Sequence, residues 1–239
     1  MVRCLAQKRV AVHAGGAYQQ LARPSCAGDT TAMTTSASPF DALVFDLGGV
    51  IIAHDNEVLH QRLVSRCTAP DASDRLRALA HDARFGTGER SIADLHQEVV
   101  REVGYGGDWD CFVGDWSCHL SVDPSMLAFV ERLSAHNRVL IFSNTNQEHW
   151  EHLLNLTGGA LGRYEAYLSH EIGQLKPSVQ SFHTVAAKAG IDPARSFFTD
   201  DVAVNVEGAR QAGFQAEMFT SQAALTQWLR SAGVDTGGR

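Results

Sequence analysis

Short apolar runs alternate with amphipathic stretches along most of this 239-residue chain, and this alternation is what most limits its fold. The runs at residues 42–45 (ALVF) and 139–142 (VLIF) end in polar residues and glycine, as buried strands do. Similar runs lie at residues 166–168, 196–199 and 216–219. Helical spacing predicts helices over residues 126–135, 148–156, 179–189, 204–212 and 221–229. Strands alternating with such helices favour βαβ units, so we predict a doubly wound α/β core with a parallel sheet.

The alternation stops between the first two predicted strands. Residues 55–122 contain only helical patterns, with Gly86, Gly88 and Gly104 among the glycines that mark turns. We therefore predict an all-helical cap domain over residues 55–122 and a core made of residues 40–54 and 123–239. Because open α/β sheets bind ligands at the carboxyl ends of their strands, this cap is expected to act as a lid.

The first 39 residues have the character of a flexible N-terminal extension, with one acid, Asp29, and a tract of Ser, Thr, Ala and Pro at the end. The unbroken apolar region of a secretory signal is missing, although a basic, acid-poor start also fits a targeting peptide. Met33 opens a short polar lead into the first strand, so residues 1–32 are also interpretable as an upstream extension. In both cases we expect the fold to begin near Phe40.

Charge and composition exclude several classes of partner. The formal charge is −7, from 20 Lys and Arg against 27 Asp and Glu, which gives no general attraction to nucleic acid or an anionic membrane. No apolar stretch approaches the roughly 18 residues that a membrane-spanning helix needs. The five cysteines form no Cys-x-x-Cys pair, which favours a reducing compartment. We expect a cytoplasmic monomer or homodimer.

Polar side chains follow the predicted strands at the point where each strand ends. They are Asp46, Ser143, Lys176 and the pair Asp200 and Asp201. A single Asp after a strand is more often a turn former or a helix cap. Together, these residues supply a nucleophile, a hydroxyl, an ammonium group and two carboxylates at one edge of a parallel sheet, which predicts one catalytic site.

Four segments carry a resemblance to a known family: LVFDLGGVI at 43–51, LIFSNTN at 140–146, LKP at 175–177 and FFTDDVAVNVEGA at 197–209. In order and spacing they resemble the motifs of the haloacid dehalogenase-like (HAD) hydrolase superfamily, over about 200 residues from Phe40 onward. The chain looks like the helical-cap branch, and is similar to its sugar-phosphate phosphatases such as α-glucose-1-phosphate phosphatase. The resemblance implies a Rossmann-like core and a Mg²⁺-dependent phosphatase that acts on a small phosphorylated metabolite.

The resemblance also implies roles for individual residues. Asp46 would attack phosphorus and form an aspartyl-phosphate. Mg²⁺ would be held by Asp46, the backbone carbonyl of Gly48 and Asp201, with Asp200 either a ligand or behind the ligands. Lys176 would neutralise charge on the transferred phosphoryl group.

The remaining roles concern the phosphate. Ser143, together with backbone N–H groups of Asn144 and of the turn at residues 47–48, would cradle the phosphoryl oxygens. The amide of Asn205 would orient Lys176 or Asp201, unless it is simply a polar residue on a helix surface.

The chain departs from the family pattern at Gly48. Phosphatases of the superfamily usually carry an Asp at this position, as general acid for the leaving group and then as base for water. The resembling sugar-1-phosphatases also have Gly there, so hydrolysis is not excluded, but good leaving groups such as anomeric, acyl or aryl phosphates are favoured. His54 is the nearest candidate substitute, with a hinge or surface histidine as the alternative.

The predicted cap offers fewer clues to specificity. Arg84, Glu89 or Arg90 would select the remote end of the substrate, unless they belong to a solvated turn. Trp109 and Trp116 are seven residues apart and are expected to pack the core of the cap, although one of them is also placed to wall the pocket.

Two other functions remain open. A 2-haloacid dehalogenase uses the equivalent Asp to displace halide from carbon without a metal, but the adjacent acids Asp200 and Asp201 make sense mainly beside a cation. The missing side chain at Gly48 also fits a phosphate-binding regulatory protein with slow turnover.

Overall fold

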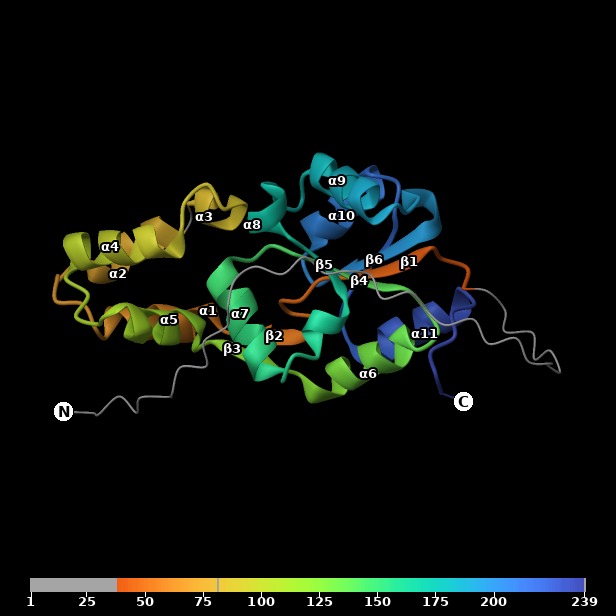
Figure 1. Ribbon diagram of the computed structural model, residues 1–239, viewed down its shortest axis with the longest axis horizontal. Coiled ribbons are helices and arrows are strands. Elements are labelled where there is room, and N and C mark those ends of the chain that lie inside the picture. Colours follow the sequence, from red (N-terminus) through yellow and green to blue (C-terminus); the bar gives the residue numbers. More distant parts are fainter. Residues whose placement is uncertain (1–37, 81, 239) are drawn as a thin grey trace, which may run out of the picture. The chain divides into compact units, whose positions relative to one another are not determined.

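The computed structural model describes residues 38–80 and 82–238 (Figure 1). Apart from Ser38 and Pro39, the predicted N-terminal extension over residues 1–39 lies outside the described residues. The expectations for that segment therefore stay predictions.

Five parallel strands form the central sheet in the order β5-β4-β1-β6-β7. The strands are β1 (Ala42–Phe45), β4 (Val139–Ser143), β5 (Glu165–Leu168), β6 (Ser196–Asp200) and β7 (Gln215–Met218). In the register of the sheet, Phe45 of β1 lies between Ile141 of β4 and Thr199 of β6. The predicted α/β core with a parallel sheet is confirmed, and β1 is its middle strand.

Helices cover both faces of this sheet, because alternate side chains of each strand point to opposite faces. Leu43 and Phe45 pack against α6 (Pro124–Ser134), α7 (Gln147–Leu156) and α11 (Gln222–Ser231). Ala42 and Val44 pack on the other face against α9 (Val179–Ala189) and α10 (Ala203–Gln211). Figure 1 shows these two helical layers on either side of the strands. All four side chains of β1 are at most 1% exposed, so both faces of the middle strand are fully buried.

Local sequence signals set the ends of these helices. The carboxylate of Asp123 accepts hydrogen bonds from the backbone N–H groups of Ser125 and Met126, and Pro124 opens α6. The hydroxyl of Ser221 caps α11 in the same way. These caps fix the residues at which α6 and α11 begin.

Five further helices lie between β1 and β4: α1 (Asn56–Val64), α2 (Ala72–Ala80), α3 (Ala83–Thr87), α4 (Ile92–Val103) and α5 (Trp109–Ser117). They enclose a hydrophobic cluster of their own, with Leu95, Val99 and Phe112 at most 2% exposed. We call these helices the cap.

The base of the cap differs from the all-helical expectation. Residues 120–122, assigned to the helical insert by their pattern, form strand β3 (Leu120–Val122), which pairs antiparallel with β2 (Ile52–His54). These strands are the two chain segments that connect the core to the cap, and pairing satisfies their backbone hydrogen bonds. A strand of three residues is too short to give a periodic signal.

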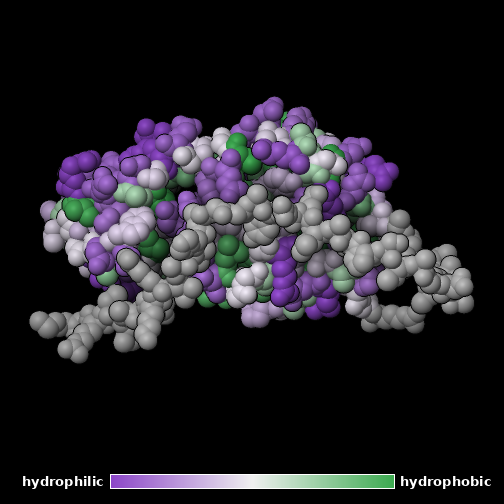
Figure 2. Space-filling model, viewed as in Figure 1, coloured by the Kyte–Doolittle hydropathy of each residue, from purple (hydrophilic) through white to green (hydrophobic). Residues whose placement is uncertain are grey.

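Hydrophilic residues cover most of the surface visible in Figure 2, and hydrophobic residues form small separate patches there. Within residues 38–80 and 82–238, no helix has the length and apolar character needed to cross a membrane.

Candidate active site

The polar residues at the carboxyl ends of β1, β4 and β6 meet at one edge of the sheet. Asp46 directly follows β1, and its backbone N–H donates to the carbonyl of Thr199 at 3.0 Å. Ser143 is the last residue of β4 and Asp200 the last residue of β6. Because β1 lies between β4 and β6, Asp46 is flanked by these two residues.

The ammonium group of Lys176 lies between two of these carboxylates. Its Nζ atom is 2.8 Å from Oδ1 of Asp46 and 2.5 Å from Oδ2 of Asp200. The rings of Phe142 and Phe198 each lie 5.4 Å from the same atom, and the side chain of Lys176 is only 1% exposed. Away from water, these contacts fix the position of the ammonium group.

Asn144 holds the Lys176 segment against the end of β4. Its side-chain Oδ1 accepts from the backbone N–H of Lys176 at 2.9 Å, and its Nδ2 donates to the carbonyl of Lys176 at 3.0 Å. The side chain of Asn144 is therefore committed to positioning Lys176, which leaves its backbone N–H for the phosphate role expected from the sequence.

Three carboxylates gather beside this single ammonium group. Oxygen atoms of Asp46, Asp200 and Asp201 all lie within 4.8 Å of one another. Burial raises the pKa of Asp46; Lys176 opposes this effect and Asp200 adds to it. Burial and the charge of Asp200 also raise the pKa of Asp201. One lysine does not balance three carboxylates, so the oxygen-rich cluster fits a hard divalent cation such as Mg²⁺.

The loop after Asp46 packs tightly against Asp201. Gly49 has φ of +71°, and a β-carbon there would stand 2.0 Å from Oδ2 of Asp201. Gly48 has no such backbone constraint, but a β-carbon there would stand 3.3 Å from Cδ2 of His54. Glycine at position 49 is therefore required by the backbone conformation and by the close approach of Asp201, whereas at position 48 only the His54 ring limits the side chain.

Asn205 contacts a residue other than those expected from the sequence. Its Nδ2 atom lies 3.1 Å from both carboxylate oxygens of Asp200, and neither Lys176 nor Asp201 is its partner. The backbone N–H of Val202 also donates to Asp200 at 2.8 Å. Asp200 is completely buried, and these donors, with Lys176, fix its orientation.

A cavity of about 460 Å³ opens over this cluster. Core residues on its wall include Asp46, Gly48, Ser143, Asn144, Lys176 and Asp201. Residues of the cap and of its connecting strands form the rest: Asn56, Asp82, Phe85, Trp116 and His119 are among them. Of the residues expected to act in catalysis or to bind phosphate or metal, only Asp200 is not on the wall, because it is completely buried behind Lys176.

Residues 40–213 match the sequence pattern of the haloacid dehalogenase-like hydrolase family, and this range contains all of these site residues. The chain belongs to this family. It is therefore a hydrolase, as the four sequence motifs indicate.

Individual proteins and solved structures show how far the similarity of this HAD-like hydrolase extends. The chain is 25% identical over 186 residues to D-ribitol-5-phosphate phosphatase from Bacteroides thetaiotaomicron, covering 72% of this chain and 88% of that protein. A HAD family enzyme from the same organism, solved with magnesium and inorganic phosphate, superimposes with a TM-score of 0.68 at 22% identity, over 78% of this chain and 98% of that one. A dehalogenase solved with an intermediate gives 0.53 at 20% identity, over 78% and 87% of the two chains. The fold alone does not separate phosphatases from dehalogenases.

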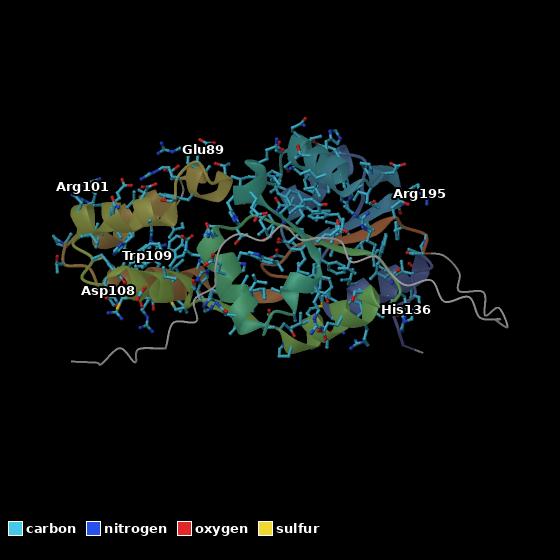
Figure 3. All side chains as sticks on the ribbon, viewed as in Figure 1. Glu89, Arg101, Asp108, Trp109, His136 and Arg195 are labelled. Carbon is cyan, nitrogen blue, oxygen red and sulfur yellow. The ribbon has the colours of Figure 1, made fainter. Side chains whose placement is uncertain are left out.

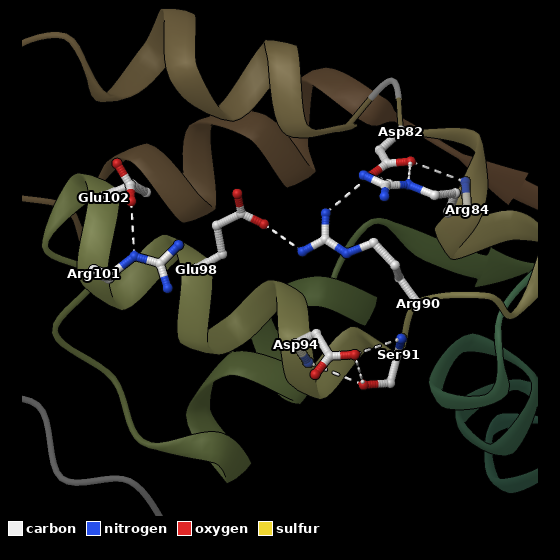
Figure 4. Close-up of polar contacts among 8 residues, drawn as sticks. All are labelled: Asp82, Arg84, Arg90, Ser91, Asp94, Glu98, Arg101 and Glu102. Carbon is white, nitrogen blue, oxygen red and sulfur yellow. Dashed lines mark hydrogen bonds and ion pairs between the residues drawn. The ribbon is translucent and has the colours of Figure 1, made fainter.

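Two of the three charged residues expected to select the substrate, Arg84 and Arg90, pair with acids within the cap of this HAD-like hydrolase (Figure 4). Arg84 and Arg90 reach Asp82 at 2.7 and 2.9 Å, and Arg90 also reaches Glu98 at 2.5 Å. Hydrogen bonds from Arg84 and Arg90 hold the pKa of Asp82 below its usual range. Glu89 is exposed on the turn after α3 (Figure 3). None of the three candidates lies on the cavity wall, whereas their partner Asp82 does.

Three histidines form one side of the cavity, and of these the sequence indicated His54 but not His119 or His149. His54 lies beside Gly48 and pairs with Leu120 across β2 and β3. His119 directly precedes Leu120. The ring of His119 lies 5.2 Å from that of His149 on α7. These contacts form between distant segments, so no local spacing in the sequence indicates them.

His149 links the core to the end of the cap. Its Nε2 lies 3.0 Å from the carbonyl of Trp116, its Nδ1 lies 3.3 Å from Nδ2 of Asn146, and its ring stacks on the Trp116 indole at 5.3 Å. A carbonyl only accepts, so Nε2 carries the proton and Nδ1 accepts from the amide of Asn146. Burial lowers the pKa of His149 to about 3 and that of His119 to about 4, so both rings are neutral near pH 7.

Proposed function

We propose that this HAD-like hydrolase is a Mg²⁺-dependent phosphatase that hydrolyses a small phosphorylated metabolite, with sugar and polyol phosphates as the favoured substrates. The observation that carries the proposal is the position of Lys176 between Asp46 and Asp200 in a cluster of three carboxylates. The D-ribitol-5-phosphate phosphatase similar to this chain supports the same class of reaction.

The reaction begins with Asp46. A carboxylate oxygen of Asp46 attacks phosphorus, the bond from phosphorus to the leaving oxygen breaks, and that oxygen keeps the electron pair. Water then attacks the phosphorus of the aspartyl-phosphate, the bond from phosphorus to the Asp46 oxygen breaks, and the Asp46 carboxylate and inorganic phosphate are released. The leaving oxygen takes up a proton from solvent, which the attacking water replaces. The ammonium group of Lys176, already 2.8 Å from Asp46, offsets the negative charge that the phosphoryl oxygens bring to the nucleophile.

The chain's own groups divide the remaining tasks. Ser143 and the backbone N–H groups of Asn144 and of the turn at residues 47–48 bind the phosphoryl oxygens. Asp46, the carbonyl of Gly48 and Asp201 would hold Mg²⁺, with Asp200 behind them. The ion supplies positive charge that allows an anionic nucleophile to approach an anionic phosphate.

Two alternatives make different experimental predictions. A 2-haloacid dehalogenase needs no metal, and the clustering of Asp200 and Asp201 beside Asp46 favours a cation-dependent reaction instead. A phosphate-binding regulatory protein with slow turnover is consistent with glycine at position 48. A cytoplasmic location is part of the proposal and rests on the cysteine pattern.

One panel of assays separates the three functions. Phosphate release from sugar, polyol, acyl and aryl phosphates is measured with and without Mg²⁺, alongside chloride release from 2-chloropropionate. We expect Mg²⁺-dependent phosphate release and no chloride release. Chloride release without metal would identify a dehalogenase, and tight phosphate binding without turnover would identify a regulatory protein.

A further inference from the structure

Helix α3 of the cap contacts the short core helix α8 (Ser169–Ile172), and the two lie side by side in Figure 1. Ser169 is completely buried, and its hydroxyl donates to the backbone carbonyl of Gly86 at 2.6 Å. Gly86 lies in the last turn of α3, where backbone carbonyls have no partner within the helix. Ser169 therefore supplies, from the core, a hydrogen bond that the end of this cap helix requires.

The same hydroxyl also contacts the loop that follows β4. The backbone N–H of Thr145 donates to Oγ of Ser169 at 2.9 Å. Thr145 directly follows Ser143 and Asn144, which are proposed to bind the phosphoryl oxygens. One buried hydroxyl thus joins this loop to the cap, in a chain of hydrogen bonds that runs from the Thr145 N–H through Ser169 to the Gly86 carbonyl.

We propose that Ser169 is a positioning residue that couples closure of the cap to the binding of phosphate beside Asp46. The inference rests on the proposed phosphatase function and adds how its site is regulated. Gly86 and Thr145 both line the cavity over Asp46, so a change at either end of the hydrogen-bond chain alters the wall that meets the substrate. Phosphate that fixes the loop after β4 therefore favours the closed cap, even without an organic group that touches the cap.

The surroundings of Ser169 offer its proton a second position. A hydroxyl carries one proton, and the carbonyl of Thr145 also lies within reach, 3.0 Å from Oγ. That carbonyl accepts from Nδ1 of His170 at 3.0 Å, and its second lone pair leaves room for another donor. When α3 moves away, the Ser169 hydroxyl turns to Thr145 and keeps a hydrogen bond. A coupling between two sites requires an element with two such discrete arrangements.

Close backbone packing makes the contact between α3 and α8 specific. Gly88, at the end of α3, has φ of +76°, and a β-carbon there would stand 2.4 Å from the carbonyl oxygen of His170. A β-carbon on Gly86 would stand 2.9 Å from Cδ2 of Leu175, the residue before Lys176. A side chain at position 88 would therefore separate α3 from α8.

Hydrogen–deuterium exchange of the α3 amides tests the coupling. A helix of five residues is unstable by itself, so its protection from exchange depends on its contact with the core. Exchange is measured on the full chain with Mg²⁺, with and without saturating inorganic phosphate, and titration calorimetry gives the phosphate affinity. We expect phosphate to slow the exchange of residues 84–88 in the unaltered protein by about fivefold or more. This ratio is the readout, because a general loss of stability changes both rates alike.

Ser169→Ala removes the hydroxyl that joins the loop to the cap. Phosphate should then slow exchange in α3 by less than about twofold, and by linkage it should bind about fivefold or more weakly. Ser181→Ala is the matched control, because Ser181 is equally buried and its hydroxyl donates to the carbonyl of Ser178 at 2.6 Å, at the start of α9 in the core. The control should keep both the phosphate affinity and the protection of α3.

Gly88→Ala tests the same contact through the backbone. The added β-carbon meets the carbonyl of His170, so exchange in α3 should become fast and insensitive to phosphate. Gly190→Ala controls for the strained backbone, since Gly190 has φ of +64° and the added carbon meets no described atom within 4 Å. This control should keep the phosphate-dependent protection.

Three results would overturn the inference. One is phosphate binding that leaves exchange in α3 of the unaltered protein unchanged. Another is the same phosphate-dependent protection in Ser169→Ala as in Ser181→Ala. The third, absence of phosphate binding, would overturn the proposed function as well. Failure of the proposed function alone is a separate result: phosphate would protect α3, and the protein would release no phosphate from any ester of the panel.

Discussion

A β-carbon on Gly48 would stand 3.3 Å from Cδ2 of His54, so the imidazole borders the space that a side chain at position 48 would enter. The backbone of Gly48 is not in the left-handed region, which means that His54, and not the turn, limits what can replace this glycine. The general acid of related phosphatases is expected at position 48. Its absence should therefore be visible in the kinetics.

Rates across a series of aryl phosphates should fall steeply as the pKa of the leaving group rises, because no side chain at position 48 protonates the departing oxygen. Gly48→Asp combined with His54→Ala supplies a carboxyl group and the space for it. The double variant should flatten this dependence and hydrolyse primary alkyl phosphates about tenfold faster or more.

His54→Ala alone is the control, and Mg²⁺ must be saturating because the new carboxyl group adds charge beside Asp46 and Asp201. A shallow dependence in the unaltered protein would contradict the prediction. A dependence that becomes steep only in His54→Ala would assign the proton transfer to His54.

Gly49→Ala should raise the Mg²⁺ concentration needed for half-maximal activity by about tenfold or more, because the new β-carbon would lie 2.0 Å from a carboxylate oxygen of Asp201. Gly190→Ala is the matched control, since Gly190 has a similar φ of +64° and nothing within 4 Å of the added carbon. Both variants should lose about 1 kcal/mol of stability from the left-handed backbone. Equal Mg²⁺ requirements in the two variants would argue against Asp201 as a ligand.

The sequence predicts the core well because its signals are local and strong. The predicted bounds of β1 and α9 coincide with the observed ones, since each apolar pattern is continuous and ends at a clear break, Asp46 in one case and Gly190 in the other. β2 and β3 were missed because each has three residues and gains its hydrogen bonds only from the other. The four-residue helix α8 (Ser169–Ile172) is likewise too short for a periodic pattern.

The same distinction applies to the site. Asp46, Ser143 and Asp200 were predictable because the ends of neighbouring parallel strands must converge. The contact between Asn205 and Asp200 depends on how the first turn of α10 faces β6, which spacing does not specify. The pairing of Arg90 with Asp82 and Glu98 depends on the packing of cap helices, and so does the position of Trp116 beside His149.

Asp46→Asn should lower turnover by about 10³-fold or more, because the amide is a poor nucleophile of nearly the same size. Without metal, its melting temperature should equal or exceed that of the unaltered protein, since burial raises the pKa of Asp46 and makes its charged form unfavourable in the folded state. Calorimetry and phosphate release measured on the same samples check both parts. Full activity in the folded variant would rule out Asp46 as the nucleophile.

His119 and His149 should make the folded protein less stable as the pH falls below about 6.5. Their pKa values in the folded state are about 4 and about 3, because burial disfavours the charged ring, whereas in the unfolded chain both take up a proton near pH 6.5. The unfolded state therefore binds more protons, and its free energy falls relative to the folded state by roughly 1.4 kcal/mol per pH unit for each histidine.

Urea denaturation between pH 7.5 and 5.5 measures this slope. The experiment is best done with Asp46→Asn, because the raised pKa of Asp46 acts in the opposite direction in acid. His149→Phe keeps a ring beside Trp116 but loses the hydrogen bond to the Trp116 carbonyl, so this variant should be less stable at pH 7.5. Its unfolding free energy should nevertheless fall less steeply with falling pH, by up to roughly 1.4 kcal/mol per pH unit, because one histidine fewer takes up a proton on unfolding. A slope unchanged by this substitution would mean that His149 takes up its proton in the folded protein as readily as in the unfolded chain. The assignment of a neutral His149 ring, hydrogen-bonded to the Trp116 carbonyl, would then be wrong.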